Sequence, residues 1–406
     1  MRLLIAAGGT GGHVYPALAV AERLLDSDPQ TTVAFVGTVG GFEKPLVEQA
    51  GVRLDSVDEV QAAPFHGVSP LKAIAGLFRT LRGTVQAFGI LGRRKPQVVL
   101  MTGGWVGLPV ALAAWLRRIP VAIFLPDIEP ALSIKILRPF ATRIAVTTPD
   151  SARYIPASKM VVTGYPLRKT FTHTIPQAGS PLLEQSDLST DEYPRFQVIG
   201  SGAEKSLVVR VTRDAGIAHF SLDPAKKTLL VFGGSRGART INIAVVDSLP
   251  QLLERGDLQI IHVTGELDAE RGQSVPPVEG YHPFAYLHDD MGLAMAAADL
   301  CLCRSGASTL GELPYFGLPS ILVPYPFAWR YQKVNAEYLA QRGAGVVLPD
   351  ELMGAQLADT VRALLDDSDK LSAMCDAARA LNRPKAAESI GQMLRQIAKP
   401  GPGELK

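Results

Sequence analysis

Two segments rich in glycine and small polar residues, one in each half of the chain, constrain its fold most strongly. Gly8–His13 (GGTGGH) lies between an apolar run at Leu3–Ala7 and a helix-like run at Pro16–Leu25. Arg304–Glu312 (RSGASTLGE) likewise follows an apolar run at Asp299–Cys303 and opens a second helix-like run. A strand that leads through such a turn into a helix presents backbone N–H groups where phosphate oxygens can bind. The pair predicts a nucleotide-linked substrate held between two α/β domains.

The remainder of the chain repeats this alternation of strand-like and helix-like runs. Short apolar, mostly β-branched or Leu-rich runs predict further strands at Thr32–Gly37, Gln97–Met101, Val121–Leu125, Arg143–Thr147, Lys159–Thr163, Thr228–Gly233, Leu258–Thr264, Ser320–Val323 and Gly345–Leu348. Helical patterns between the strands lie at Ala73–Phe88, Met291–Ala297 and Ala355–Leu365. Strands that alternate with helices predict parallel sheets covered on both faces. Two such series predict an α/β protein of two doubly wound, Rossmann-like domains.

The first series ends near Gly164-Tyr165-Pro166, which is typical of an interdomain linker. We therefore expect an N-terminal domain at residues 1–165 and a C-terminal domain at 166–385. A length of 406 residues is comfortable for two such domains.

An extra segment at about residues 170–225 fits the alternation poorly. Pro176–Pro194 is rich in Pro, Ser, Gln and acidic residues and is predicted to be a surface excursion. Phe196–Phe220 reads as strand-like. The sequence leaves open whether this segment is an inserted hairpin, a lid or a decoration.

The charge of the chain is nearly balanced but unevenly distributed. A formal net charge of +2 argues against a general nucleic-acid binder. Between Glu59 and Asp127 the sequence has no Asp or Glu, so the N-terminal half carries a basic region that the total conceals. Its basic residues are Lys72, Arg79, Arg82, Arg93, Arg94, Lys95, Arg117 and Arg118.

The cysteines and the apolar runs predict a cytosolic protein. Cys301 and Cys303 alternate on an apolar strand, and with Cys375 they form no C-x-x-C pair, so we expect free thiols in a reducing compartment. The N-terminus lacks the pattern of a signal peptide. The longest apolar stretch, Val106–Leu116, is too short to span a bilayer.

A predicted helix at Leu71–Gly89 places large apolar residues on one stripe with basic residues around it. The stripe consists of Leu71, Ile74, Phe78, Leu81, Val85 and Phe88. The default interpretation is an amphipathic helix that packs on its own sheet. Because the surroundings lack acidic residues, a helix at about residues 71–95 attracted to an anionic membrane surface is the alternative.

The first glycine loop carries a candidate general base. Thr10, Gly11 and Gly12 let backbone N–H groups approach a ligand closely. His13 falls at the helix start, where the positive dipole end opposes protonation and favours a neutral imidazole able to take a proton. The alternative is a helix-capping histidine without a catalytic task.

A third glycine segment, Gly103–Pro109, follows another predicted strand. Gly104 and Trp105 are candidates to line the cleft on the acceptor side. Trp105 could equally be a partly buried core residue.

The second domain opens with its own glycine loop, Gly233–Arg239 (GGSRGAR). Ser235, Arg236 and Gly237 are candidate phosphate-binding residues, with a purely structural turn as the alternative. At the later loop, Ser308 and Thr309 place hydroxyl groups at a helix start. Glu312 offers a carboxylate suited to the two hydroxyls of a ribose.

His288-Asp289-Asp290 precedes a predicted helix. An Asp there is expected to cap the helix, and His288 is included among the candidate substrate-binding residues. No His/Cys cluster has the spacing of a metal site, so we expect neither a metal nor another cofactor.

Taken together, these motifs resemble the MurG-type glycosyltransferases of family 28 over nearly the whole chain outside about residues 170–225. The matching segments are Gly8–His13 with Pro16–Ala19, Gly233–Arg239, Arg304–Ala307 with Thr309 and Glu312, and Gln332 with Asn335-Ala336. The resemblance implies a GT-B fold, two Rossmann-like domains facing across a cleft, with the last helix at about 386–399 crossing back to the first domain. It implies inverting transfer of N-acetylglucosamine from UDP-N-acetylglucosamine to a polyprenyl-diphosphate-linked muramyl-pentapeptide, converting lipid I to lipid II in peptidoglycan synthesis. It also implies a cytoplasmic protein, peripheral on the inner face of the plasma membrane.

The same resemblance implies roles for single residues. Glu312 would take the ribose hydroxyls, while Ser235, Ser308 and Thr309 would face the diphosphate. Gln332 would contact the sugar, with Asn335 also at the substrate. Arg168, in Gly-Tyr-Pro-Leu-Arg, would lie near the nucleotide.

Two departures from the family pattern suggest a divergent member. The family has His-Glu-x-Asn where this chain has Phe124-Leu125-Pro126-Asp127, and Tyr331 replaces a His before Gln332. Asp127 is therefore a second candidate base, since a partly buried carboxylate can accept a proton. Another lipid or small-molecule acceptor, a UDP-sugar epimerase and a non-catalytic UDP-sugar- or lipid-binding relative remain alternatives.

Overall fold

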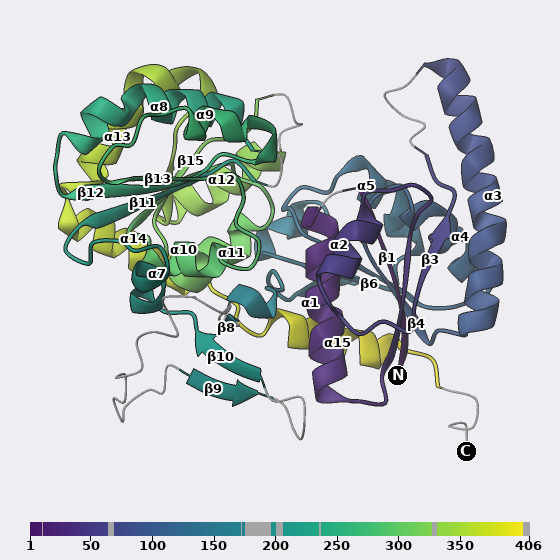
Figure 1. Ribbon diagram of the computed structural model, residues 1–406. Helices are drawn as coiled ribbons and strands as arrows, with labels where there is room; N and C mark the ends of the chain where they lie inside the picture. The colour runs from purple at the N-terminus through teal and green to yellow at the C-terminus, as the bar shows by residue number, and fades with distance from the viewer. Residues whose placement is uncertain are drawn as a thin grey trace. The chain divides into compact units, whose positions relative to one another are not determined.

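A computed structural model describes residues 1–9, 11–63, 69–171, 173–174, 196–199, 206–234, 237–326 and 331–400 (Figure 1). The chain divides into two compact units. Unit 1 comprises Met1–Leu167 and Arg383–Lys406, and unit 2 comprises Arg168–Asn382. The first unit thus extends two residues beyond the expected boundary at 165.

Unit 1 is built on a seven-stranded parallel sheet in the order β3-β2-β1-β4-β5-β6-β7. Its strands are β1 (Arg2–Ala7), β2 (Thr32–Thr38), β3 (Ser56–Val60), β4 (Val98–Gly103), β5 (Val121–Leu125), β6 (Arg143–Val146) and β7 (Met160–Val162). Every residue of β4 and β5 is buried, as expected for strands covered on both faces. The strand order reverses between β1 and β4, and ligands bind at such a reversal in open α/β sheets.

The helices of unit 1 include one from the end of the chain. They are α1 (Gly11–Ser27), α2 (Glu43–Gln49), α3 (Pro70–Arg94), α4 (Gly107–Leu116), α5 (Leu132–Leu137) and α15 (Ala386–Ile397), with short 3₁₀ turns at Arg138–Phe140 and Pro149–Arg153. Helix α15 packs beside α1, where Gly391 leaves room for Leu24 and Arg23 pairs with Glu388 at 2.9 Å.

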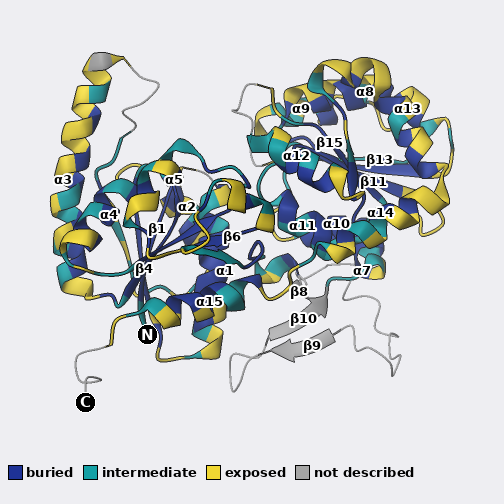
Figure 2. Cartoon of the chain, turned by 180° about the vertical axis from the view of Figure 1, so that it is seen from behind, coloured by how far each residue is buried: buried dark blue, intermediate teal, exposed yellow. Residues whose placement is uncertain are grey.

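Helix α3 packs on unit 1 through small residues, so the default prediction for its apolar stripe is wrong. The buried side consists of Gly76, Thr80, Gly83, Ala87, Ile90 and Leu91. A Cβ on Gly83 would overlap the backbone oxygen of Gln61, so only glycine permits this approach. The large apolar residues face outward, with exposed fractions of 82% for Leu71 and 74% for Val85. Figure 2 shows exposed residues along much of α3.

Unit 2 contains a six-stranded parallel sheet in the order β13-β12-β11-β14-β15-β16. Its strands are β11 (Lys227–Phe232), β12 (Leu258–Val263), β13 (Tyr281–Phe284), β14 (Leu300–Cys303), β15 (Ser320–Leu322) and β16 (Gly345–Val347). Its helices are α7 (Arg213–His219), α8 (Arg239–Leu253), α9 (Ala269–Gln273), α10 (Met291–Ala297), α11 (Thr309–Phe316), α12 (Tyr331–Gln341), α13 (Met353–Leu365) and α14 (Ser368–Ala380), with 3₁₀ turns at Lys169–Phe171, Glu266–Asp268 and Asp350–Leu352. Here the order reverses between β11 and β14.

The extra segment forms a small antiparallel sheet of β8 (His173–Thr174), β10 (Ser206–Arg210) and β9 (Phe196–Ile199). The excursion predicted at Pro176–Pro194 lies outside the described residues. The strand-like interpretation of Phe196–Phe220 fails in its last part, where α7 forms. Thr212 caps that helix by accepting the Ala215 N–H at 3.2 Å.

Two parallel sheets in an α/β arrangement confirm the fold class expected from the strand–helix alternation. The edge strands β3 and β13 were not predicted, because Ser56–Val60 is partly charged and Tyr281–Phe284 contains a proline. None of the helices among the described residues combines the length and apolar character needed to cross a membrane.

Candidate functional site

Two glycine loops meet at the carboxyl edge of the unit 1 sheet. Gly103 ends β4 and Gly104 follows it, with φ of +139° and +83°, values that favour glycine. A Cβ on Gly104 would lie 2.5 Å from the oxygen of Gly8, so the loops after β1 and β4 contact one another directly. Thr10 lies outside the described residues, while Gly11 and Gly12 open α1. The predicted acceptor-side glycines are thus adjacent, at the point where the strand order reverses.

His13 is held in the first turn of α1 beside both loops. Its Nδ1 lies 3.1 Å from the carbonyl oxygen of Gly8, and a Cβ on Gly103 would lie 2.6 Å from its Nε2. A carbonyl oxygen can only accept, so Nδ1 carries the hydrogen and Nε2 keeps a lone pair. Burial lowers the pKa of His13, while the bond to Gly8 acts in the opposite direction. The imidazole is therefore neutral near pH 7 and able to take a proton.

Glu43, at the start of α2, is a site residue that the sequence analysis missed. Its side chain is almost fully buried, and Oε1 accepts the Gly9 N–H at 3.1 Å and the Thr38 hydroxyl at 3.2 Å. Its buried Oε2 meets no hydrogen-bond partner among the described residues. A Cβ on Gly8 or Gly41 would overlap the carboxylate. The sequence offered one signal for this residue, the Gly40-Gly41 pair two positions before it. By local pattern alone, Glu43 is interpreted as an exposed residue at a helix start.

Asp127 lies in the loop after β5, at the same edge of the sheet. It is half-buried, as is Trp105 in the loop after β4. Because β4 lies between β1 and β5, the ends of β1 and β5 are about 10 Å apart. His13 and Asp127 therefore stand on opposite sides of Gly104, where each could reach a different part of one ligand.

In unit 2, the loops after β11 and β14 flank the reversal of strand order. Gly234 and Gly237 have φ of +91° and +74°, and a Cβ on Gly237 would overlap the Thr264 oxygen. Ser235 and Arg236, predicted here as phosphate-binding residues, lie outside the described residues. Across the reversal, the buried Arg304 pairs with Asp350 and donates to the Thr240 hydroxyl at 2.7 Å. Arg304 thereby anchors its loop to the start of α8.

The sequence analysis places Asn335 at the substrate, but the structure buries it behind the loop after β14. It is completely buried, and its Nδ2 donates to the Ser305 oxygen at 3.2 Å. The Ser305 hydroxyl in turn donates to the backbone oxygen of Gln332 at 2.7 Å. These bonds fix the loop after β14 on α12, so Asn335 supports the loop from behind.

Thr309 and Gln332, also predicted to contact the nucleotide-sugar, form hydrogen bonds with backbone groups of unit 2. Thr309 is buried, and its hydroxyl donates to the Gly306 oxygen at 2.6 Å, so its side chain faces away from solvent. Gln332 is half-buried at the start of α12, and its Oε1 accepts the Tyr325 N–H at 2.9 Å.

Glu312 lies one helical turn inside α11, with Ser308 and Arg168 near it. The Ser308 hydroxyl donates to Oε2 of Glu312 at 2.8 Å. Burial raises the pKa of the Glu312 carboxyl, and the Ser308 bond and the charge of Arg168 act against that rise. Three predicted residues thus form one polar group at the carboxyl end of β14.

The segment before α10 differs from its predicted role. Asp290 occupies the N-cap position, but its side chain makes no capping bond and its Oδ2 lies 3.5 Å from Nε2 of His219. The His288 ring lies beside the Tyr286 ring, with the centroids 4.5 Å apart and the planes tilted by 56°.

A chain of buried polar side chains reaches the Thr264 carbonyl, against which Gly237 packs. His262, on β12, lies 2.9 Å from the Tyr281 hydroxyl through Nδ1 and 3.1 Å from Asn242 Oδ1 through Nε2. Asn242 donates to the Thr264 oxygen and to Asp268, both at 2.8 Å. The Tyr281 hydroxyl therefore donates to Nδ1 and Nε2–H to Asn242, and desolvation lowers the pKa of His262 to about 4.

Two Rossmann-like units, each with glycine loops on both sides of its strand-order reversal, define a two-domain nucleotide-binding enzyme of the α/β class. The family models for the glycosyltransferase family 28 N-terminal and C-terminal domains match residues 3–146 and 228–390. The chain belongs to glycosyltransferase family 28.

Several proteins are similar over nearly the full length. A UDP-N-acetylglucosamine--N-acetylmuramyl-(pentapeptide) pyrophosphoryl-undecaprenol N-acetylglucosamine transferase of Desulforudis audaxviator is 36% identical, covering 99% of this chain and 100% of the relative. The protein of that name from Geobacter sulfurreducens is 37% identical, with coverages of 96% and 97%. Acinetobacter baumannii MurG superposes with a TM-score of 0.69 at 25% identity, covering 97% of this chain and 99% of the other.

A UDP-GlcNAc 2-epimerase of Neisseria meningitidis, solved with UDP-GlcNAc bound, superposes with a TM-score of 0.63. It covers 98% of this chain and 100% of the epimerase at 13% identity. This likeness shows the shared fold alone.

Proposed function

We propose that this enzyme transfers N-acetylglucosamine from UDP-N-acetylglucosamine, with inversion, to a polyprenyl-diphosphate-linked muramyl-pentapeptide in peptidoglycan synthesis. The observation that carries the proposal is the identity of 36% and 37%, over nearly full length, to two relatives named for this reaction. The arrangement of His13 and Glu312 at the strand-order reversals of the two sheets supports it.

The acceptor half-reaction falls to unit 1. Nε2 of His13 takes the proton of the acceptor hydroxyl, and the hydroxyl oxygen attacks the anomeric carbon of the donor sugar. The glycine N–H groups at the start of α1, next to the positive end of its dipole, suit the diphosphate of the acceptor. Asp127, two strands away, is the second candidate base.

The donor half-reaction falls to unit 2. As the new bond forms, the bond from the anomeric carbon to the diphosphate breaks and UDP leaves with the electron pair. The starts of α8 and α11 point the positive ends of their dipoles toward the carboxyl edge of the sheet, where they would stabilise that charge. Glu312 would hold the ribose hydroxyls, with Arg168 and Ser308 beside it.

A lipid-linked acceptor requires contact with a membrane, and α3 offers the surface for it. Seven large apolar side chains on its outer face are between 41% and 82% exposed: Leu71, Ile74, Leu77, Phe78, Leu81, Val85 and Phe88. Arg117 extends this surface from the end of α4, with its guanidinium 3.8 Å from the centre of the Phe88 ring. Apolar and basic side chains on one face favour an anionic bilayer, so we place the protein on the inner face of the plasma membrane.

The test is UDP release from UDP-N-acetylglucosamine, with and without a short-chain analogue of the muramyl-pentapeptide lipid. Acceptor-dependent release with a disaccharide product is expected. Donor binding without such release would instead indicate another acceptor or a non-catalytic binder. Conversion of the UDP-sugar without acceptor would indicate an epimerase.

A further inference from the structure

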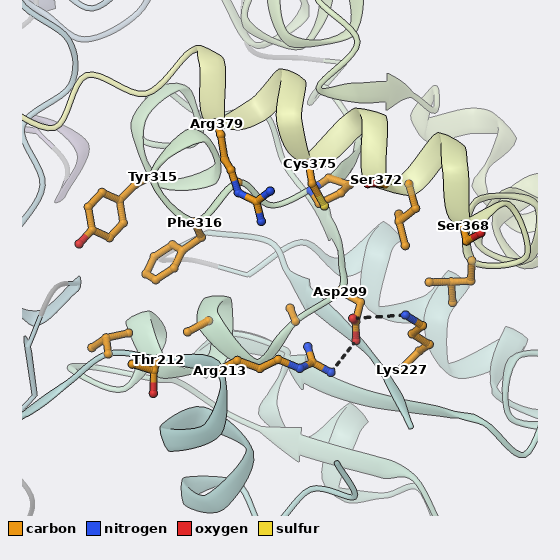
Figure 3. A pocket seen from close by; sticks show the side chains of 17 residues that line it. Thr212, Arg213, Lys227, Asp299, Tyr315, Phe316, Ser368, Ser372, Cys375 and Arg379 are labelled. Atoms are coloured by element: carbon orange, nitrogen blue, oxygen red, sulfur yellow. Dashed lines mark hydrogen bonds and ion pairs between the residues drawn. The ribbon is translucent and has the colours of Figure 1, made fainter. Parts of the chain in front are cut away.

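A cavity of 770 Å³ lies in unit 2 at the amino ends of β11, β14 and β15, the opposite edge of the sheet from the glycine loops (Figure 3). Lys227, Asp299 and Pro319 stand at or just before the starts of these strands. One side of α14 forms the facing wall. The volume falls within the range of small-molecule sites, and the proposed transfer reaction uses none of these residues.

The charged side chains that line the cavity are predominantly basic. Arg213 and Lys227 come from one wall and Arg379 from the other (Figure 3). Asp299 is the single acidic residue among those lining it. The lining therefore carries three positive charges against one negative, a net of +2.

Asp299 forms ion pairs with both basic residues of its wall, so these two residues carry one positive charge more than it balances. Its Oδ2 accepts from Arg213 Nη2 at 3.1 Å and from the Thr228 N–H at 2.8 Å. The ion pair with Lys227 is the looser of the two, since Nζ lies 3.7 Å from Oδ1, too far for a hydrogen bond. Arg379 pairs with Asp376 at 3.1 Å, but both are well exposed, and such pairs are weak.

The remaining lining suits a ligand that carries both an anionic group and an apolar group. Thr212, Ser368 and Ser372 contribute hydroxyl groups, while Phe316, Leu365 and Leu371 form apolar wall. A phosphate monoester carries a charge of about −1.5 to −2 at neutral pH, which matches the net charge of the lining. Guanidinium groups also pair with phosphate oxygens through two parallel bonds.

We propose that this cavity binds a phosphorylated small molecule, with its phosphate between Arg379 and the pair Arg213 and Lys227. The apolar part of the ligand lies against Phe316 and Leu371. This site is separate from the proposed donor site, because the two occupy opposite edges of the same sheet.

Cys375 provides a probe inside the cavity. It lines the cavity and is half-buried, whereas Cys301 and Cys303 are fully buried. Its side chain comes from α14, the wall that also carries Arg379 and Ser372 (Figure 3). Burial raises the pKa of this thiol, so alkylation is best followed at alkaline pH, where more of the reactive thiolate is present.

The experiment measures alkylation of Cys375 by iodoacetamide in the full-length protein, saturated with UDP so that the donor site is filled. Phenyl phosphate at millimolar concentration is the probe, and benzyl alcohol is the neutral comparison. Phenyl phosphate is expected to slow alkylation of Cys375, and benzyl alcohol is not. Isothermal titration calorimetry of the same UDP-saturated protein gives the dissociation constant of phenyl phosphate independently of thiol reactivity.

The variants Lys227→Gln and Arg379→Gln, combined, test the basic residues at exposed positions that should leave folding intact. We expect the dissociation constant of phenyl phosphate to rise about tenfold or more in the double variant. Arg362→Gln, at an exposed α13 residue outside the cavity, should leave it unchanged. Absence of binding in the UDP-saturated protein, equal protection by benzyl alcohol, or equal affinity in the double variant would each overturn the proposal.

Discussion

Nδ1 of His13 lies 3.1 Å from the carbonyl oxygen of Gly8, and this one contact fixes which imidazole nitrogen can take a proton. Because Nδ1 carries the hydrogen, the lone pair remains on Nε2, which lies beside Gly103. The loop that positions this candidate base is thus part of the loop proposed to bind the acceptor diphosphate. A ligand that moved Gly8 would also move His13.

We predict that His13→Ala and Asp127→Asn each lower kcat, and that the base is the residue with the larger loss. Loss of a general base costs about 10²- to 10⁴-fold. The rate of UDP release at saturating donor and acceptor gives kcat for each variant. Because burial lowers the pKa of His13, the acid limb of kcat should lie below the ordinary imidazole pKa of 6.5. Wild-type turnover in both variants would contradict the assignment.

Glu43→Ala should weaken acceptor use while leaving the donor site intact. The substitution removes the acceptor of the Gly9 N–H, so the loop loses a charge-assisted bond worth about 1.5–3 kcal/mol, or roughly 10- to 100-fold in kcat/KM for the acceptor. Glu43→Gln, which keeps an acceptor oxygen, should lose less. Glu48→Gln, at an exposed position on the same helix, is the control. An equal loss of UDP affinity would point to general unfolding instead.

Glu312→Ala should weaken UDP binding by about tenfold or more, through the lost ribose contacts. Protonation of Glu312 removes an acceptor, so the affinity of the wild type should fall as pH drops through the pKa of this carboxyl. Burial raises that pKa above 4.5, and the loss should begin at correspondingly higher pH. Calorimetric titration with UDP across mildly acidic pH measures both effects. A pH-independent affinity in the wild type would argue against contact between Glu312 and the nucleotide.

The double variant Phe78→Glu/Val85→Glu should detach the protein from membranes without destabilising it. Both side chains are largely exposed, and burying each in a bilayer surface contributes about 1.5–3 kcal/mol. Sedimentation with vesicles containing anionic phosphatidylglycerol measures the loss. Leu267→Glu, at a 75% exposed position in unit 2, should bind like the wild type. Turnover of a short-chain soluble acceptor should be unchanged, and vesicle binding equal to wild type would refute the α3 surface.

His262 should make unfolding sensitive to mild acid. Its folded pKa of about 4 lies below the unfolded value of 6.5, so the unfolded state takes up the proton first as pH falls. The stability contribution is complete above pH 6.5, declines between 6.5 and 4, and is largely gone below 4. The difference of about 2.5 pKa units corresponds to ~3 kcal/mol.

His262→Gln should remove this pH dependence. Denaturant unfolding of wild type and variant at neutral pH and near pH 4 gives the comparison. The stability advantage of the wild type should shrink by ~3 kcal/mol at the lower pH. A constant difference between the two proteins would show that His262 is not the titrating group.

The proposed donor site shows what local sequence could and could not predict. Glu312 and Ser308 could be predicted as candidates because a strand, a turn and a helix start are all encoded within a few consecutive residues, and the structure joins their side chains by a hydrogen bond. Asn335 sits in an equally recognisable motif, yet its side chain is buried behind the loop. Glu43 was missed because the Gly8-Gly9 backbone that its side chain contacts comes from a chain segment about 34 residues earlier.

The sequence by itself determined the α/β class, the two series of strands and the glycine turns at their ends, since strand, turn and helix signals act between near neighbours. Tertiary structure alone decided which face of each element lies inward. On α3 the periodicity identified one large apolar stripe, but packing buries the opposite face of Gly76, Thr80, Gly83 and Ala87. Close approach to Gln61 requires the small residues there, and that contact joins segments whose proximity no local pattern encodes.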